Sequence, residues 1–141
     1  MREILFRGQH RRYGEHVNMA GEKLPPVWVY GGVLQGEGDF SIIYGSKSPD
    51  GKFEEKYSVY TETLGQYTGL TDKNGKKIFE GDIVLRHDKK AEVRYQPSEF
   101  VLVFPDNPYP QCGLLTTSYL NENKEVIGNI YDNQELLKEA T

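Results

Sequence analysis

Short apolar and aromatic runs, bounded by turn residues, follow one another along most of the 141-residue chain. Clear examples are VWVYGGVL at residues 27–34, DFSIIYG at 39–45 and KYSVYTE at 56–62, with Pro49-Asp50-Gly51 at the tip of one connection. Runs of this length with tight turns between them are typical of antiparallel strands. Together with Ile4–Phe6 they predict four strands before residue 65, the second of which ends or bulges at Gly31-Gly32.

The second half shows three closely spaced runs, then a loop and a late strand. Residues 105–113 contain three prolines and are predicted to be loop. The closing DNQELLKEA predicts a short helix capped by Asp132 or Asn133. The predicted strands are IVLRHD at 83–88, AEVRYQ at 91–96, EFVLVF at 99–104, LLTTSYL at 114–120 and KEVIGNIY at 124–131.

These elements predict a mainly β fold of small antiparallel sheets, with an SH3-like, partly open barrel in the C-terminal half and a short C-terminal helix. The predicted domains are an N-terminal β-rich lobe at 1–64 and the barrel with its helix at 65–141, or one continuous domain. Residues 8–26, polar and closed by Pro25-Pro26, are predicted to form a long loop or arm.

Composition narrows the cellular setting. The single cysteine, Cys112, excludes an intramolecular disulfide framework and a cysteine-rich zinc site. The charged N-terminus MREILFRGQHRR lacks the apolar core of a secretory signal, and the longest apolar runs are far shorter than a membrane span. We expect a soluble, cytoplasmic protein.

The net charge of −4 argues against a general nucleic-acid binder, because phosphate binding depends on Lys and Arg. The charge is nevertheless uneven. Residues 1–12 contain four arginines and one acid, whereas residues 99–141 contain seven acids and two lysines. Two solvated surfaces are the simplest interpretation, and docking or self-association is the alternative.

The densest motif is QYTGLTDKNGKKIFEGDIV at residues 66–84. It is not an EF-hand, because the twelfth position counted from Asp72 is Ile83 rather than a carboxylate. It is not a P-loop, because the glycines are wrongly spaced and Lys76 is followed by Lys77. Turn chemistry explains it better: Asn74-Gly75 predicts a type I′ hairpin turn, and Glu80-Gly81-Asp82 a corner in which Asp82 accepts backbone N–H bonds. The residues predicted to be structural are Gly69, Asp72, Asn74, Gly75, Gly81, Asp82 and Gly128.

No set of residues has the pattern of a catalytic or metal centre. The three histidines lie apart without acidic or cysteine partners at ligand spacing, and Cys112 has no neighbouring base. No G-x-S-x-G motif occurs. We therefore predict no catalytic residues, no metal, no cofactor and no enzymatic activity.

Aromatic residues interleaved with arginines allow a stacking surface for single-stranded nucleic acid, although strand aromatics are more often core pairs. This stacking set consists of Tyr13, Trp28, Tyr30, Tyr44, Tyr57, Tyr60, Tyr67 and Tyr95, with Arg7, Arg12 and Arg94. The residues predicted to contact nucleic acid or another partner are Arg7, Arg11, Arg12, Trp28, Tyr30 and Arg94.

Residues 65–84, GQYTGLTDKNGKKIFEGDIV, closely resemble the signature of the YopX family of phage and prophage proteins. EVIGNIYDNQELL at 125–137 is similar to that family's closing motif, and REILFRG followed by WVYGGV to its N-terminal pattern. The resemblance implies an SH3-like barrel portion and a phage or prophage origin in a bacterial host. It implies no activity, because the family's function is unestablished.

Three functions follow as hypotheses. The first is a non-enzymatic accessory protein that acts through protein–protein contacts or as a homo-oligomer. The second is a nucleic-acid-binding module that uses the barrel face and the N-terminal arginines. The third is a small toxin-type RNase with Arg86, His87 and Glu92 as its acid/base set.

Overall fold

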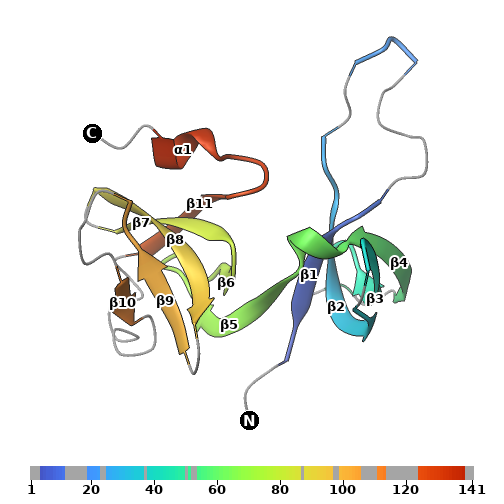
Figure 1. Ribbon diagram of the computed structural model, residues 1–141, viewed down its shortest axis with the longest axis horizontal. Coiled ribbons are helices and arrows are strands. Elements are labelled where there is room, and N and C mark those ends of the chain that lie inside the picture. The colour runs from blue at the N-terminus through green and yellow to red at the C-terminus, as the bar shows by residue number, and fades with distance from the viewer. Residues whose placement is uncertain are drawn as a thin grey trace. The chain divides into compact units, whose positions relative to one another are not determined.

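The structure, a computed structural model, shows two compact β units (Figure 1). Residues Ile4 to Gln66 form the N-terminal unit, and the residues from Tyr67 onward form the C-terminal unit. The expected boundary between 64 and 65 lies near this division, and the assignment of the two lobes as separate domains stays a prediction. The residues that the structure describes are 4–11, 19–22, 25–36, 38–49, 51, 54–86, 88–96, 99–105, 111–113 and 124–138.

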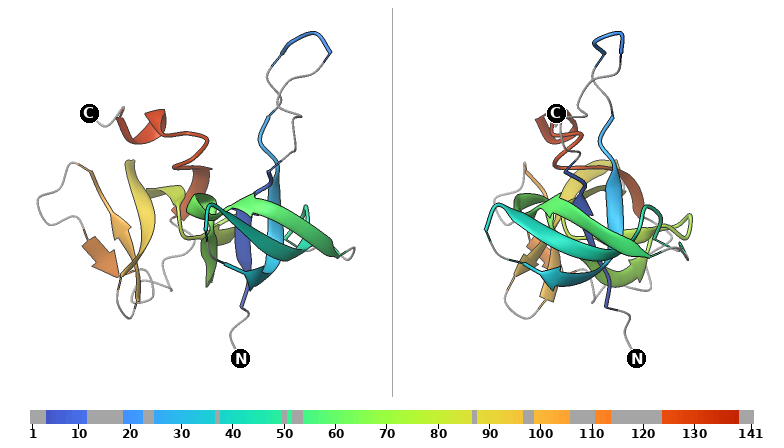
Figure 2. Two further views of the ribbon diagram at one scale, coloured as in Figure 1. Left: turned by 45° about the vertical axis from the view of Figure 1, so that its right-hand side comes forward. Right: turned by 90° about the vertical axis from the view of Figure 1, so that its right-hand side faces the viewer.

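All pairing in the N-terminal unit is antiparallel, in the strand order β4-β3-β2-β1-β5. At its end β1 also reaches β4: His10 forms an isolated bridge with Val59, and the Arg11 N–H donates to the Ser58 carbonyl at 2.8 Å. The sheet therefore curls on itself (Figure 2). Its elements are β1 (Phe6–Gln9), β2 (Trp28–Gln35), β3 (Phe40–Ser46), β4 (Glu55–Tyr60), the 3-10 turn η1 (Thr61–Thr63) and the start of β5 (Gly65–Thr71).

The core of the N-terminal unit is small. Val29, Ile43 and Val59 are fully buried on one side of the sheet, as the period-two alternation of their strands requires. Gly8 allows β1 to pack closely on them, since a Cβ there would lie 2.9 Å from Val59 Cγ2. Val33, Tyr57 and Leu64 pack around this centre.

The C-terminal unit contains an antiparallel five-stranded sheet in the order β10-β9-β8-β7-β11, in which the last strand returns to pair with β7. No pairing among the described residues closes this sheet into a barrel, which agrees with the predicted small antiparallel sheets and partly open architecture. The elements are the end of β5, β6 (Lys77–Phe79), β7 (Asp82–Arg86), β8 (Lys89–Gln96), β9 (Glu99–Val103), β10 (Gln111–Gly113), β11 (Lys124–Asn129) and α1 (Glu135–Lys138).

The core of the C-terminal unit is larger, and it draws side chains from six strands, β5 to β9 and β11, when the partly buried ones are counted. Helix α1 contacts β8 in this unit, with Leu136 and Leu137 partly buried. Strand content among the described residues is 59%, so the predicted mainly β class with a short C-terminal helix is confirmed. The buried core residues are Ile78, Val84, Ala91, Val93, Phe100 and Leu102, with Leu70, Phe104 and Val126 packed against them.

Three local predictions were wrong. The predicted loop at 8–26 is strand at its beginning, because Gly8 and Gln9 pair with Val29 and Trp28. The predicted loop at 105–113 ends in β10, because Gln111 follows the last proline and pairs with Val103. Strand β2 continues past Gly31-Gly32, and its irregularity lies between Val33 and Gln35. The predicted strand at 114–120 lies outside the described residues.

Candidate functional site

Asp72, in the densest motif, is a buried carboxylate that holds backbone rather than a ligand. Its side-chain Oδ1 accepts the N–H groups of Asn74 and Lys76 at 2.8 and 2.9 Å, and its Oδ2 accepts the Val126 N–H at 2.9 Å. Asp72 is only 5% exposed. Hydrogen bonds to the charged group offset the cost of burying it, so Asp72 links the turn to β11 in a structural role.

The turn that Asp72 organises differs from the predicted type I′ geometry. A type I′ turn requires positive φ at both central residues. Gly75 has φ 81°, but Asn74 does not have a positive φ, since Asp88 is the one non-glycine residue with positive φ in the described part of the chain. The Gly75 N–H donates to the Asp72 carbonyl at 3.0 Å, and the Asp72 N–H donates to the Lys76 carbonyl at 2.8 Å. This is a three-residue loop with a left-handed glycine, which the Asp72 side chain favours by bonding inside the turn.

The Glu80-Gly81-Asp82 corner is also structural. Asp82 is 1% exposed, and its Oδ2 accepts the Phe79 N–H at 2.8 Å. Gly81 has φ 92°, its N–H donates to the Val93 carbonyl at 2.8 Å, and its carbonyl accepts the Ile130 N–H at 2.9 Å. The left-handed φ explains glycine at this position, as it does at Gly69 with φ 90°.

The dense motif and the closing motif meet in space. Besides the Asp72–Val126 bond, the Lys73 N–H donates to the Lys124 carbonyl at 2.9 Å. Within the closing motif, a Cβ on Gly128 would lie 2.6 Å from Asn133 Oδ1, the atom that accepts the Asn129 N–H. The two motifs therefore form one scaffold.

The residues predicted to contact a partner divide between the two units. Arg7, Arg11, Trp28 and Tyr30 lie in the N-terminal unit, and Arg94 lies on β8 in the C-terminal unit. Arg12 lies outside the described residues. Arg94 Nη2 donates to Glu92 Oε1 at 3.0 Å, and this hydrogen bond raises the pKa of Arg94.

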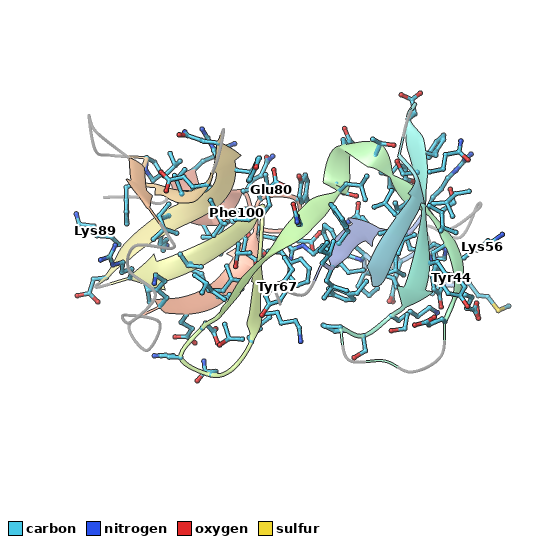
Figure 3. The ribbon with its side chains drawn as sticks, turned by 90° about the horizontal axis from the view of Figure 1, so that it is seen from below. Tyr44, Lys56, Tyr67, Glu80, Lys89 and Phe100 are labelled. Atoms are coloured by element: carbon cyan, nitrogen blue, oxygen red, sulfur yellow. The ribbon has the colours of Figure 1, made fainter. Side chains whose placement is uncertain are left out.

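The outward side of the N-terminal sheet, opposite the Val29, Ile43 and Val59 core, gathers aromatic side chains from three strands. The strand pairings place Tyr44 opposite Gly32 and Lys56, and Phe40 opposite Tyr60. Figure 3 shows Tyr44 and Lys56 on the same side of this unit. We call this surface the aromatic face; it consists of Arg7, Gln9, Arg11, Trp28, Tyr30, Gly32, Phe40, Ile42, Tyr44, Ser46, Lys56, Ser58 and Tyr60.

The accessible part of the aromatic face lies on β3 and β4. Phe40 and Tyr44 are 38% and 42% exposed, whereas Arg7 is buried. The Arg11 guanidinium lies 3.7 Å above the centroid of the Phe40 ring, and the Tyr60 ring lies 5.7 Å from it. These contacts make a small cluster in which a planar cation covers an aromatic ring.

Every charged residue of the aromatic face is a cation: Arg7, Arg11 and Lys56. The carboxylate of Glu55, next to Lys56 in β4, alternates onto the other side of that strand. The face is therefore locally cationic, although residues 4–66 contain seven Lys and Arg against eight Asp and Glu.

The residues considered for RNase chemistry do not come together in the described part. The strand pairing puts Arg86 on the side of Val84 and Glu92 on the side of Ile83, so they lie on opposite faces of the sheet. His87 lies outside the described residues. No group of three His, Cys, Asp or Glu residues suited to a metal ion occurs among the described residues.

Sequence reasoning included Tyr44 and Tyr60 in the stacking set and missed Phe40 and Lys56. The usable signal was strand alternation, since Phe40, Ile42 and Tyr44 share one face at spacing two. The register between β3 and β4, which puts Lys56 beside Tyr44, has no marker in either strand alone.

Comparison with known proteins places the chain in a family. Within the described residues, no helix is long and apolar enough to cross a membrane. A comparison with curated proteins finds no match. Among solved structures, the crystal structure of protein EF1440 from Enterococcus faecalis is similar, with 23% identity, coverage of 97% of this chain and 99% of that chain, and a TM-score of 0.48. The family model described as YopX protein matches residues 34–138, which include the dense motif and the closing motif, and this chain therefore belongs to the YopX family.

Proposed function

We propose that this protein is a non-enzymatic accessory protein of a phage or prophage that binds an anionic macromolecule through its aromatic face. The observation that carries the proposal is the composition of that face. Exposed rings of Phe40 and Tyr44 lie among Arg11 and Lys56, and the face contains no carboxylate. Exposed aromatic and arginine side chains are enriched where proteins meet their partners.

The buried carboxylates support binding rather than catalysis. Asp72 and Asp82 accept backbone N–H groups at 2.8–2.9 Å, which is the arrangement of turn-holding residues. A general acid or base would instead need to reach a substrate proton.

Self-assembly is a second candidate, and charge restricts its geometry. A symmetric dimer through the aromatic face would bring cations against cations, because an isologous interface places a patch against itself. The acidic stretch at 99–141, with seven acids and two lysines, has the opposite charge. A second copy would therefore dock head to tail, with its acidic stretch on the aromatic face.

Amide NMR spectra of ¹⁵N-labelled protein test the proposed function. Unlabelled decaglutamate and an unlabelled 12-nucleotide oligothymidine serve as anionic probes at low salt. At least one probe should shift the amides of Phe40, Tyr44 and Lys56 and leave those of β7 and β8 in place. Decalysine of the same length is the matched control and should shift none of them.

Light scattering at 50 and 500 mM salt tests self-assembly separately. A head-to-tail oligomer should dissociate at high salt, because its contacts are screened.

In the NMR experiment, amide shifts confined to the C-terminal unit, or absent with both anionic probes, would contradict the proposed function.

A further inference from the structure

We infer that the occupant of the aromatic face is a single-stranded nucleic acid, whose bases stack on the rings of β3 and β4. This inference rests on the proposed function and names the class of partner. It requires rings at a suitable spacing, cations beside them and room for a base.

Ring spacing is the first requirement. Phe40 and Tyr44 lie four residues apart on the outward side of β3, with Ile42 between them, so the two ring positions are separated by about 13 Å along the strand. Tyr60 adds a ring beside Phe40 from β4. Sheets that bind single strands use aromatic side chains arranged in this way, each carrying one base.

Cations beside the rings are the second requirement. Lys56 is exposed and lies directly opposite Tyr44, where an ammonium group can contact the phosphate next to a stacked base. The Arg11 guanidinium, 3.7 Å above Phe40, extends the platform as a charged plane. Guanidinium planes stack on bases much as aromatic rings do.

Room for a base is the third requirement. Gly32 is exposed opposite Tyr44, and a Cβ built on it would meet nothing within 4 Å. The Tyr44 ring therefore has an open neighbour on the β2 side.

The same features separate this partner from other polyanions. An acidic peptide offers charge but no planar bases, so it would leave the rings of Phe40 and Tyr44 unused. A duplex keeps its bases stacked inside the helix, where these rings do not reach them. We therefore expect single strands to bind more tightly than duplexes of the same sequence.

Fluorescence anisotropy with 5′-labelled 12-nucleotide oligothymidine at 50 mM salt tests the inference. The Tyr44→Ala and Phe40→Ala variants should each weaken binding by roughly 5- to 100-fold, because Tyr44→Ala removes the stacking partner of one base and Phe40→Ala removes the ring that supports the Arg11 plane. Tyr44→Phe keeps the ring and should stay within about twofold of wild type. The matched control is Tyr95→Ala, which removes a tyrosine that is 53% exposed in the C-terminal unit and should change nothing.

Salt dependence gives an independent readout. With Arg11 and Lys56 as the two accessible cations, about two phosphates are neutralised, and affinity should fall roughly sevenfold between 50 and 200 mM salt. Lys56→Ala should halve the slope of the logarithm of affinity against the logarithm of salt concentration. Lys89→Ala, which removes an exposed lysine of the C-terminal unit, should leave this slope unchanged.

Labelled decaglutamate and a labelled duplex complete the experiment. The inference would be overturned if Tyr44→Ala and Phe40→Ala left the affinity for oligothymidine unchanged, or if the duplex bound as tightly as oligothymidine. Binding of decaglutamate alone, lost in Lys56→Ala, would overturn the inference and leave the proposed function standing. Failure of every probe to bind would overturn both.

Discussion

The N-terminal and C-terminal units are both antiparallel sheets, yet they are stabilised differently. The N-terminal unit centres on three fully buried aliphatic side chains, and its strands approach closely at the Gly31–Gly45 pair. The C-terminal unit buries a larger apolar cluster and uses the carboxylates of Asp72 and Asp82 to satisfy backbone N–H groups. The first unit places many of its aromatic residues outward, and the second devotes its most distinctive residues to its own scaffold.

This difference separates the family signature from the candidate binding surface. The signature residues are occupied by backbone contacts within the C-terminal unit, so they explain the fold. The aromatic face lies in the unit with the smaller core, where each fully buried Val or Ile stabilises by about 1.5–3 kcal/mol. We therefore expect the N-terminal unit to be the less stable of the two.

The largest effect should come from Gly45→Ala. A Cβ at Gly45 would lie 1.8 Å from the Tyr30 carbonyl oxygen and 2.7 Å from Gly31 Cα. Backbone atoms on a paired strand cannot move aside, so the N-terminal unit should lose more than about 3 kcal/mol of unfolding free energy. Urea unfolding followed by the fluorescence of Trp28, the one tryptophan, measures this loss.

Gly32→Ala is the matched control for Gly45→Ala, because the added Cβ has nothing within 4 Å. It should change the unfolding free energy by less than about 1 kcal/mol. Hydrogen exchange of β7–β9 amides should be the same in both variants. Equal loss of protection in the C-terminal unit would show that the two units unfold together.

Asp72→Ala is the converse test, directed at the C-terminal unit. It removes the acceptor of three backbone N–H groups and should cost about 3 kcal/mol, with exchange accelerated at Val126 and in the turn. The Trp28 transition should not move. Glu55→Ala, which removes an exposed carboxylate, is the control and should leave both transitions in place. An unchanged exchange rate at Val126 would contradict the linking role of Asp72.

Local pattern predicted the strands well because alternation and turn residues are local properties. Strand β3 was expected at 39–45 and occurs at Phe40–Ser46, and the meander of β7 to β9 follows its predicted runs. Proline and glycine misled the prediction at Gln111, where a strand begins directly after a proline, and at Gly31-Gly32, where β2 continues.

Long-range contacts could not be predicted from one sequence. Asn74-Gly75 favours a type I′ turn in isolation, but the Asp72 carboxylate selects a different loop and bonds to Val126, 54 residues away. The aromatic face could not be predicted for the same reason, because only the strand register places Lys56 beside Tyr44. The residues were visible in the sequence, and their placement was not.

A moderate effect is expected from Thr68→Val in the irregular pairing of β5 with β6. The fully buried Thr68 hydroxyl donates to the Ile78 carbonyl at 2.8 Å and accepts the Leu70 N–H at 3.2 Å. Valine keeps the shape and leaves both groups unsatisfied, so the C-terminal unit should lose about 1–2 kcal/mol in urea unfolding followed by circular dichroism. Thr68→Ser keeps the hydroxyl and should recover more than half of the loss. A valine variant as stable as wild type would show that water replaces the hydroxyl.

The smallest effect concerns Asp88, whose φ of 67° lies in the left-handed region, in the tight connection between β7 and β8. Aspartate tolerates this conformation better than most residues, so Asp88→Gly should stabilise the C-terminal unit by no more than about 0.5–1 kcal/mol, and Asp88→Ala should destabilise it by about 1 kcal/mol. The circular dichroism transition in urea measures both changes. At position 88 a glycine would relieve the backbone strain of a positive φ, whereas at position 45 glycine is needed because a Cβ has no space. Comparing alanine at the two positions therefore separates these two reasons for glycine. If Asp88→Gly destabilised the unit, a side-chain contact of Asp88 would outweigh its backbone strain, and the β7–β8 hairpin would depend on a polar contact as the turn at Asp72 does.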